Sequence, residues 1–187
     1  MAGAQRCAPT YPMDRIYPHR LSTRMPLFDY GQSGAYFVSL VAIGRQPLFG
    51  RILNNAVQLS DAGLIVREEW LRPPLIRPGV YLDDWTIMPD HFHAILIIDM
   101  DIHRDMGTVG AHRCAPAKTL HRQPRTLGSV IAQFKATTTK CINDLRGTPG
   151  EKVWQRGYND RVIRNEVELD KLREYIQNNA RFQGHNL

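Results

Sequence analysis

Two histidines, two positions apart inside an apolar stretch, constrain this sequence more than any other feature. The stretch Trp85–Asp99 reads WTIMPDHFHAILIID, and His91 and His93 directly precede the apolar run Ala94–Ile98, which predicts a buried strand. Because successive side chains of a strand point to opposite faces, both imidazoles share one face, with Cα atoms about 7 Å apart, while Phe92 turns away. Such a pair can converge on one metal ion. It can also be no more than two polar residues at a strand end.

The composition is that of a soluble globular protein, with 187 residues of which 43% are hydrophobic and 22% charged. This length suits one domain with a sizeable core. No apolar run is long enough to cross a bilayer, and the N-terminus lacks the apolar centre of a signal peptide, so we expect a cytosolic protein without membrane partners. The cysteines Cys7, Cys114 and Cys141 are scattered and suit free thiols better than disulfides or a zinc site.

Positive charge is concentrated in one segment. The whole chain has a formal net charge of +6, and the segment from Arg104 to Arg146 alone carries the same excess, because its eight basic residues face only Asp105 and Asp144. A one-sided basic segment is expected for a protein that binds a polyanion, and nucleic acid is favoured over a membrane because no basic amphipathic helix accompanies it. The alternative is a solvated loop. The eight residues are Arg104, Arg113, Lys118, Arg122, Arg125, Lys135, Lys140 and Arg146.

Two segments without apolar periodicity frame the predicted domain. Residues 1–26 are rich in proline and arginine and predict an extended or flexible arm. Residues from about 101 to 126 predict a basic loop or insertion within a domain that spans 27–187.

Periodicity predicts the elements of that domain. Besides the histidine strand, segments rich in β-branched and aromatic residues predict strands or hairpins over 35–43, 47–51, 80–88, 153–158 and 161–164, with a turn at 54–55. Apolar residues at helical spacing predict helices over 61–71, 127–145 and 165–179. Ser60 is the expected cap of the first helix, and Asn165 with Glu168 has the spacing of a capping box for the last.

Three polar residues of the predicted helices are candidates for the chemistry of the histidine pair. Tyr175 and Asn179 are four residues apart and share one helical face. If that helix lies across the sheet, the amide oxygen of Asn179 could complete a site for Mg²⁺ or Mn²⁺, with Tyr175 as an adjacent nucleophile whose pKa of about 10 makes metal assistance useful. The alternative is a core tyrosine and a C-terminal cap. Lys135 borders an apolar stripe, where its ammonium could enter a neighbouring cleft or remain in solvent.

The order of these motifs resembles that of the single-tyrosine transposases of the HUH superfamily, named after the pattern histidine, hydrophobic residue, histidine. The resemblance covers about residues 27–182 except 101–126, and is strongest to the REP-associated tyrosine transposases and their insertion-sequence relatives. It implies an α+β fold, in which helices pack on a central antiparallel sheet and the C-terminal helix carries the catalytic tyrosine. The segments that carry it are MPDHFH, LGSVIAQFKATTTKCIN, VWQRGYNDRVIRN and EYIQNN.

Carried over residue by residue, the resemblance implies that His91, His93 and Asn179 bind a divalent metal ion and that Tyr175 is the nucleophile. The implied reaction is cleavage and rejoining of single-stranded DNA beside hairpins through a 5′-phosphotyrosine, as in the transposition of REP-type elements at a prokaryotic nucleoid. Some relatives act as homodimers and others as monomers. The candidate DNA-binding residues are Lys135, Arg161, Arg164 and Arg125.

The sequence also allows other functions, and it departs from the family pattern at one position. Relatives commonly have Asn where this chain has Asp90, which adds a charge beside the first histidine. A catalytically silent relative that only binds hairpin DNA would keep the same motifs. A small metalloenzyme of the cupin type would need a Glu at Ile97 or Ile98, and one of the histidine-triad type would need a third His at Ile95.

Overall fold

The computed structural model describes residues 33–54, 56–99 and 126–182, with side chains as far as 179. The predicted arm and nearly all of the predicted insertion lie outside these ranges. The elements follow each other as β1 (Gly34–Val41), the short 3-10 turn η1 (Ile43–Arg45), β2 (Gly50–Leu53), β3 (Ala56–Leu59), α1 (Asp61–Leu71), α2 (Pro73–Ile76), β4 (Val80–Ile87), β5 (His91–Ile98), α3 (Leu127–Arg146), β6 (Asn159–Ile163) and α4 (Glu166–Phe182).

A four-stranded antiparallel sheet in the order β4-β5-β1-β6 forms the centre of the molecule. The histidine strand β5 is therefore an inner strand, as predicted. Its residue His93 lies opposite Ser39 of β1 and opposite Thr86 of β4. The hairpin of β2 and β3 is separate from this sheet. None of the helices in the described ranges is both long and apolar enough to cross a lipid bilayer.

One face of the sheet is covered by α1 and α3 and holds the main hydrophobic core. Alternate residues of the inner strands point to this face, among them the fully buried Phe92. Aromatic rings interlock there, with ring centroids 4.9 Å apart for Trp70 and Phe92, 5.6 Å for Phe92 and Phe134, and 5.9 Å for Phe134 and Trp154. The indole nitrogen of Trp154 donates to Thr138 Oγ1 at 2.9 Å. This core fixes the strands whose opposite face bears the histidines.

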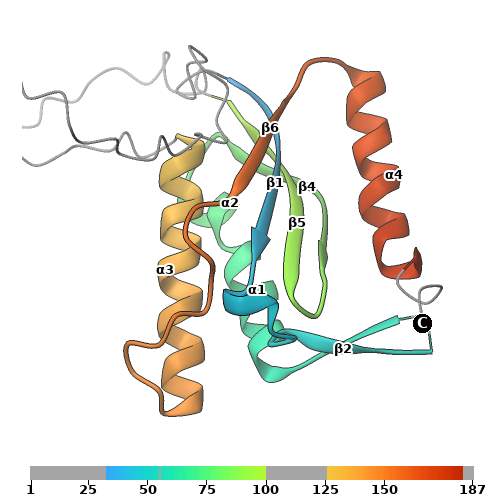
Figure 1. Ribbon diagram of the computed structural model, residues 1–187. Coiled ribbons are helices and arrows are strands. Elements are labelled where there is room, and N and C mark those ends of the chain that lie inside the picture. Colours follow the sequence, from blue (N-terminus) through green and yellow to red (C-terminus); the bar gives the residue numbers. More distant parts are fainter. Residues whose placement is uncertain (1–32, 55, 100–125, 183–187) are drawn as a thin grey trace, which may run out of the picture.

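The other face of the sheet carries α4. Figure 1 shows α3 and α4 on opposite sides of the sheet, with α4 beside β4 and β5. Because side chains alternate along a strand, the residues of β5 that face α4 are the odd-numbered ones, His91, His93, Ile95 and Ile97. The structure therefore separates a packing face from a face on which polar groups can be presented to a ligand.

A bulge in β4 changes which of its residues reach α4. Leu82 pairs with Leu96 of β5 and Trp85 pairs with Ala94, so Asp83 and Asp84 together stand opposite the single residue between those partners. This two-against-one count defines a β-bulge. As a result Leu82 and Trp85 both pack against the core, although they are three residues apart.

Most of the predicted elements are confirmed. Ser60 caps α1, since its hydroxyl accepts from the amide of Gly63 at 3.2 Å. Asn165 caps α4 by accepting from the amide of Glu168 at 2.9 Å, but the Glu168 carboxylate accepts from the amide of Arg164 rather than from that of Asn165, so the predicted capping box is only half formed. The segment 153–158 is not a strand, because only Trp154 forms a single bridge, to Ala42.

Candidate active site

The histidine pair lies at the start of β5, on the face that carries α4. The rings of His91 and His93 are neighbours, with centroids 4.8 Å apart and planes at 69°. His93 is buried, with 7% of its surface exposed, and His91 is half-buried. The two imidazoles therefore converge on one face, as the alternation of side chains along the strand predicts.

Tyr175 reaches the histidine pair from α4 of the same chain. Its hydroxyl oxygen is 3.5 Å from Nε2 of His93, and the two ring centroids are 5.5 Å apart. About half of the Tyr175 surface (49%) is exposed, so the hydroxyl stands between a buried imidazole and solvent. This position leaves the phenol open to a bulky substrate from outside.

Phe37 of β1 forms a wall of the same site. Its ring stacks on that of His93, with centroids 5.3 Å apart and planes at 25°, and it meets the Tyr175 ring edge-on at 6.1 Å. Sequence reasoning missed this residue. Alternation placed it on one face of β1, but only the pairing register with β5 identifies that face as the one with the histidines.

Burial keeps His93 uncharged at neutral pH. Removal of the ring from water, and to a lesser extent the nearby His91, lower the pKa of His93 to about 4, while Asp90 acts in the opposite direction. A neutral imidazole has one nitrogen with a free lone pair, which is the form that binds metal ions. Nδ1 of His93 is buried and has no hydrogen-bond partner among the described residues.

Asp90 orients the other imidazole. Nδ1 of His91 donates to the Asp90 carboxylate at 2.5 Å, and Arg45 lies 3.6 Å from the second carboxylate oxygen. A proton held on Nδ1 leaves the lone pair on Nε2, so the contact fixes both the tautomer and the ring orientation of His91. Asp90 is thus a candidate functional residue. The sequence showed only that it adds a charge beside the first histidine, and the structure shows that its carboxylate contacts the imidazole of His91.

Asn179 lies one helical turn beyond Tyr175, and both line a hollow along α4 together with Lys171, Glu174 and Asn178. Its Nδ2 atom is buried and has no hydrogen-bond partner within the part of the chain that the structure describes. Rotation of the amide by half a turn exchanges this nitrogen for the oxygen. The group can therefore donate a hydrogen bond to a ligand or present its oxygen as an acceptor or metal ligand.

The donor set fits a divalent metal ion only as a partly open site. Among the described residues there is no group of three or more His, Cys, Asp or Glu that could hold a metal ion. His91 and His93 supply two neighbouring imidazoles, and the amide of Asn179 on α4 is the predicted third donor; such a set would leave positions for water and for a substrate oxygen. This combination is compatible with Mg²⁺ or Mn²⁺.

The remaining predicted site residues are dispersed. Lys135 is on α3, across the sheet from the histidines, and its ammonium donates to the carbonyls of Gln155 and Gly157 at 2.7 and 2.6 Å. Burial lowers the pKa of Lys135. Its expected position beside the histidine site is therefore wrong, because the apolar stripe of α3 packs on the opposite face.

The predicted basic residues near α4 lie on the exposed surface. Arg161 stands opposite Phe37 on the edge strand β6 and forms an ion pair with Glu168 at 2.5 Å. Arg164 is also exposed, between β6 and α4. Arg125 lies outside the described residues. Arg161 thus lies on the face of the sheet that carries Tyr175, and Arg164 lies in the connection to α4, while their contact with DNA stays a prediction.

Comparison with known sequences places the chain in a family. No protein-family model matches it. An uncharacterized protein of Haemophilus influenzae is 34% identical over 163 residues, which make up 86% of this chain and 88% of that protein. The chain belongs to the same family as that protein.

Comparison with solved structures identifies the fold. A REP-associated tyrosine transposase bound to a REP hairpin overlaps 82% of this chain and 70% of its own, with a TM-score of 0.52 and 16% sequence identity. The chain has the fold of that transposase. The predicted α+β fold with helices packed on an antiparallel sheet is confirmed, and it is the fold of a REP-associated tyrosine transposase, as the resemblance in the sequence implied. A second structure, from Deinococcus radiodurans, overlaps 83% of this chain and 95% of its own with 12% identity, but its TM-score of 0.43 is too low to establish a shared fold.

Proposed function

We propose that the chain is a tyrosine transposase that cleaves and rejoins single-stranded DNA beside a hairpin. The single observation that carries the proposal is the distance of 3.5 Å between the Tyr175 hydroxyl oxygen and Nε2 of His93. The His91 ring lies next to that of His93 on the same face of the sheet. The fold shared with a REP-associated tyrosine transposase supports the same conclusion.

The proposed step is a transesterification at phosphorus. The phenolic oxygen of Tyr175 forms a bond to a backbone phosphorus atom, and the bond from that phosphorus to O3′ of the preceding nucleotide breaks. The phenol loses its proton and O3′ gains one, which leaves a 5′-phosphotyrosine and a free 3′-hydroxyl. Because one phosphodiester replaces another, attack by a 3′-hydroxyl can reverse the step without a nucleotide cofactor.

A divalent ion bound here, Mg²⁺ or Mn²⁺, would polarise the phosphate and neutralise part of the charge that develops on it. His91, oriented by Asp90, and the neutral His93 are the proposed ligands, with Asn179 as the third. Phe37 keeps water from one side of the imidazole of His93.

The proposed DNA surface is the exposed side of α4 and its connection to β6. Lys171 lines the hollow that also holds Tyr175, while Arg161 and Arg164 lie at the N-terminal end of the helix. Cations at these positions can contact phosphates on either side of the cleaved bond, so binding is expected to weaken steeply as salt concentration rises.

The test is the formation of a covalent adduct. The protein is incubated with Mg²⁺ or Mn²⁺ and a labelled single strand that carries a hairpin and its unpaired flank, taken from the DNA around its own gene. Wild type is expected to give a labelled band that survives denaturation, and Tyr175→Phe is expected to give none. Tyr81→Phe, which alters another tyrosine of similar exposure (46%), is the matched control and should retain the adduct.

Two results would overturn the proposal. An adduct that persists in Tyr175→Phe would assign the nucleophile to another residue. Binding of the hairpin strand by wild type without an adduct in either metal would identify a protein that holds hairpin DNA but does not cut it.

A further inference from the structure

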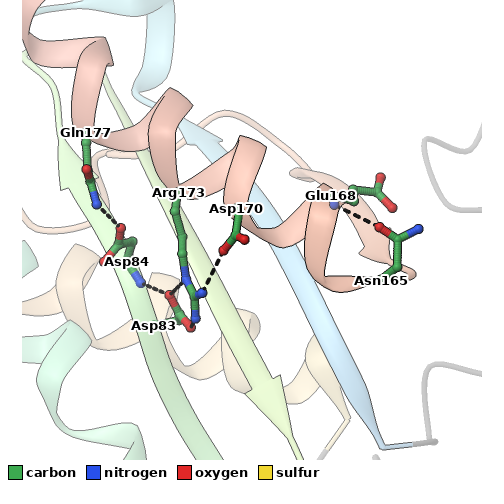
Figure 2. A network of polar contacts seen from close by, with 7 residues as sticks. All are labelled: Asp83, Asp84, Asn165, Glu168, Asp170, Arg173 and Gln177. Carbon is green, nitrogen blue, oxygen red and sulfur yellow. Dashed lines mark hydrogen bonds and ion pairs between the residues drawn. The ribbon is translucent and has the colours of Figure 1, made fainter.

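A set of polar contacts joins α4 to the bulge of β4 (Figure 2). Nε and Nη2 of Arg173 donate to the two carboxylate oxygens of Asp83 at 2.9 and 2.6 Å, and Nε2 of Gln177 donates to Asp84 at 2.8 Å. The amide of Asp84 donates to Asp83 at 2.7 Å, which steadies the acceptor. We call the Asp83–Arg173 and Asp84–Gln177 contacts the α4 clasp.

The clasp depends on the bulge in β4. In a regular strand, Asp83 and Asp84 would point to opposite faces, and only one of them could reach the helix. The extra residue of the bulge allows both to contact α4. The bidentate geometry of Arg173 on Asp83 adds directionality that a single contact would lack.

Apolar packing alone holds α4 weakly in place. Among the described side chains of this helix, only Ile176 is buried, with 2% of its surface exposed. Leu169 and Leu172 are half-buried, and Val167 is 64% exposed. A narrow apolar contact of this kind resists separation from the sheet better than it resists rotation of the helix about its own axis.

Tyr175 and the clasp lie on opposite flanks of the buried stripe. At 100° per residue, Gln177 is displaced from Ile176 in one direction and Tyr175 by the same angle in the other, while Arg173 lies on the side of Gln177. A rotation that loosens the clasp therefore moves the phenol relative to His93.

We propose that the α4 clasp sets the rotation of α4 that brings the Tyr175 hydroxyl to His93, which makes Asp83 and Arg173 positioning residues for the strand-transfer reaction. This inference rests on the proposed function. A rotation of about 20° moves a side-chain tip roughly 2 Å, because a helix with its side chains is roughly 10–12 Å across. Misplacement of a reacting group by about 1 Å can slow a reaction roughly 100-fold.

The charges of the clasp persist across the usual range of pH. The hydrogen bonds from Arg173 lower the pKa of Asp83, and the contact with Asp83 raises the pKa of Arg173. The contact therefore acts as a constant constraint at the pH of any DNA-cleavage assay.

The test separates positioning from folding and from DNA binding. Arg173→Ala is expected to slow adduct formation at saturating DNA roughly 100-fold, with a Kd for the hairpin strand close to that of wild type and a thermal midpoint that is lowered but stays well above the assay temperature. The double variant Asp83→Arg, Arg173→Asp restores an ion pair of reversed polarity and should recover most of the rate. Asp170→Asn is the matched control, because Asp170 contacts the same arginine within α4 at 3.1 Å but does not reach β4, and it should keep the wild-type rate.

A wild-type rate in Arg173→Ala, or a well-folded charge-reversed variant that stays slow, would overturn the inference. If wild type itself forms no adduct, the proposed function fails, and amide hydrogen exchange then decides the role of the clasp independently. Faster exchange confined to α4 in Arg173→Ala would uphold the clasp, and unchanged exchange would refute it.

Discussion

Replacement of Asp90 gives a graded prediction for metal affinity. Asp90 accepts a hydrogen bond from Nδ1 of His91 at 2.5 Å, and both side chains are largely shielded from solvent, at 21% and 12% exposed. Asp90→Asn keeps the size and an acceptor oxygen but removes the charge, whereas Asp90→Ala removes both. The affinity for Mn²⁺ is therefore expected to fall in the order wild type, Asn variant, Ala variant.

The magnitude follows from the type of contact. Loss of a partner that orients a metal-binding histidine typically lowers metal affinity about 10- to 100-fold, or roughly 1.4 to 2.7 kcal/mol. Asp90→Asn belongs at the lower end and Asp90→Ala at the upper end. Arg45, whose side chain is 70% exposed and 3.6 Å from Asp90, should contribute little, so Arg45→Ala is expected to stay within about twofold of wild type.

Calorimetric titration of the DNA-free protein with Mn²⁺ measures these affinities directly, without reliance on cleavage activity. His93→Ala, which removes a proposed ligand, gives the reference for a disabled site. An Asp90→Ala protein that binds Mn²⁺ as tightly as wild type would refute the role of Asp90 in orienting the imidazole. If Arg45→Ala loses as much Mn²⁺ affinity as Asp90→Ala, the effect comes from the charge around the site and not from the orientation of the His91 imidazole.

Three further predictions concern the site wall, the clasp and the core. Phe37→Leu removes the ring that stacks on the buried imidazole and should slow adduct formation about 3- to 10-fold without weakening hairpin binding; an unchanged rate would assign Phe37 to packing alone. The pKa of Asp83 is lowered in the folded protein, so its stabilisation should be complete above its unfolded pKa of about 3.9 and be lost as pH falls through the lower folded value. The difference in thermal midpoint between wild type and Asp83→Asn should therefore shrink on acidification, and a difference that grows would contradict this sign. Thr138→Val leaves the buried indole of Trp154 without its acceptor and should lower the free energy of unfolding by about 1–3 kcal/mol in urea titrations, while Thr137→Val, at a half-buried position, should change it much less.

The fold could be predicted from the sequence wherever one period of hydrophobicity dominates. Alternation along β5 gave the shared face of His91 and His93, and helical spacing gave the shared face of Tyr175 and Asn179. The meeting of these two faces was inferred from the resemblance to a family, and the contact between Tyr175 and His93 agrees with it.

The features that the sequence did not predict depend on register and on the choice of face. Phe37 joins the site only because β1 pairs with β5 so that it stands opposite Ile95. The bulge that turns Asp83 and Asp84 toward α4 shifts the apolar alternation by one residue between Leu82 and Trp85, but only the pairing with β5 identifies this shift as a bulge. Lys135 was misplaced because an apolar stripe predicts that a helix packs on a sheet, but not on which side.

The central claim is that Tyr175 becomes covalently linked to DNA, and mass spectrometry of the adduct tests it most directly. After exhaustive nuclease and trypsin digestion, the peptide 174–181, EYIQNNAR, contains a single tyrosine and no other hydroxyl side chain. We predict that this peptide carries the mass of a 5′-linked nucleotide, with fragmentation that locates it on Tyr175. A nucleotide on any other peptide, or an unmodified 174–181 peptide in a gel-purified adduct, would contradict the account.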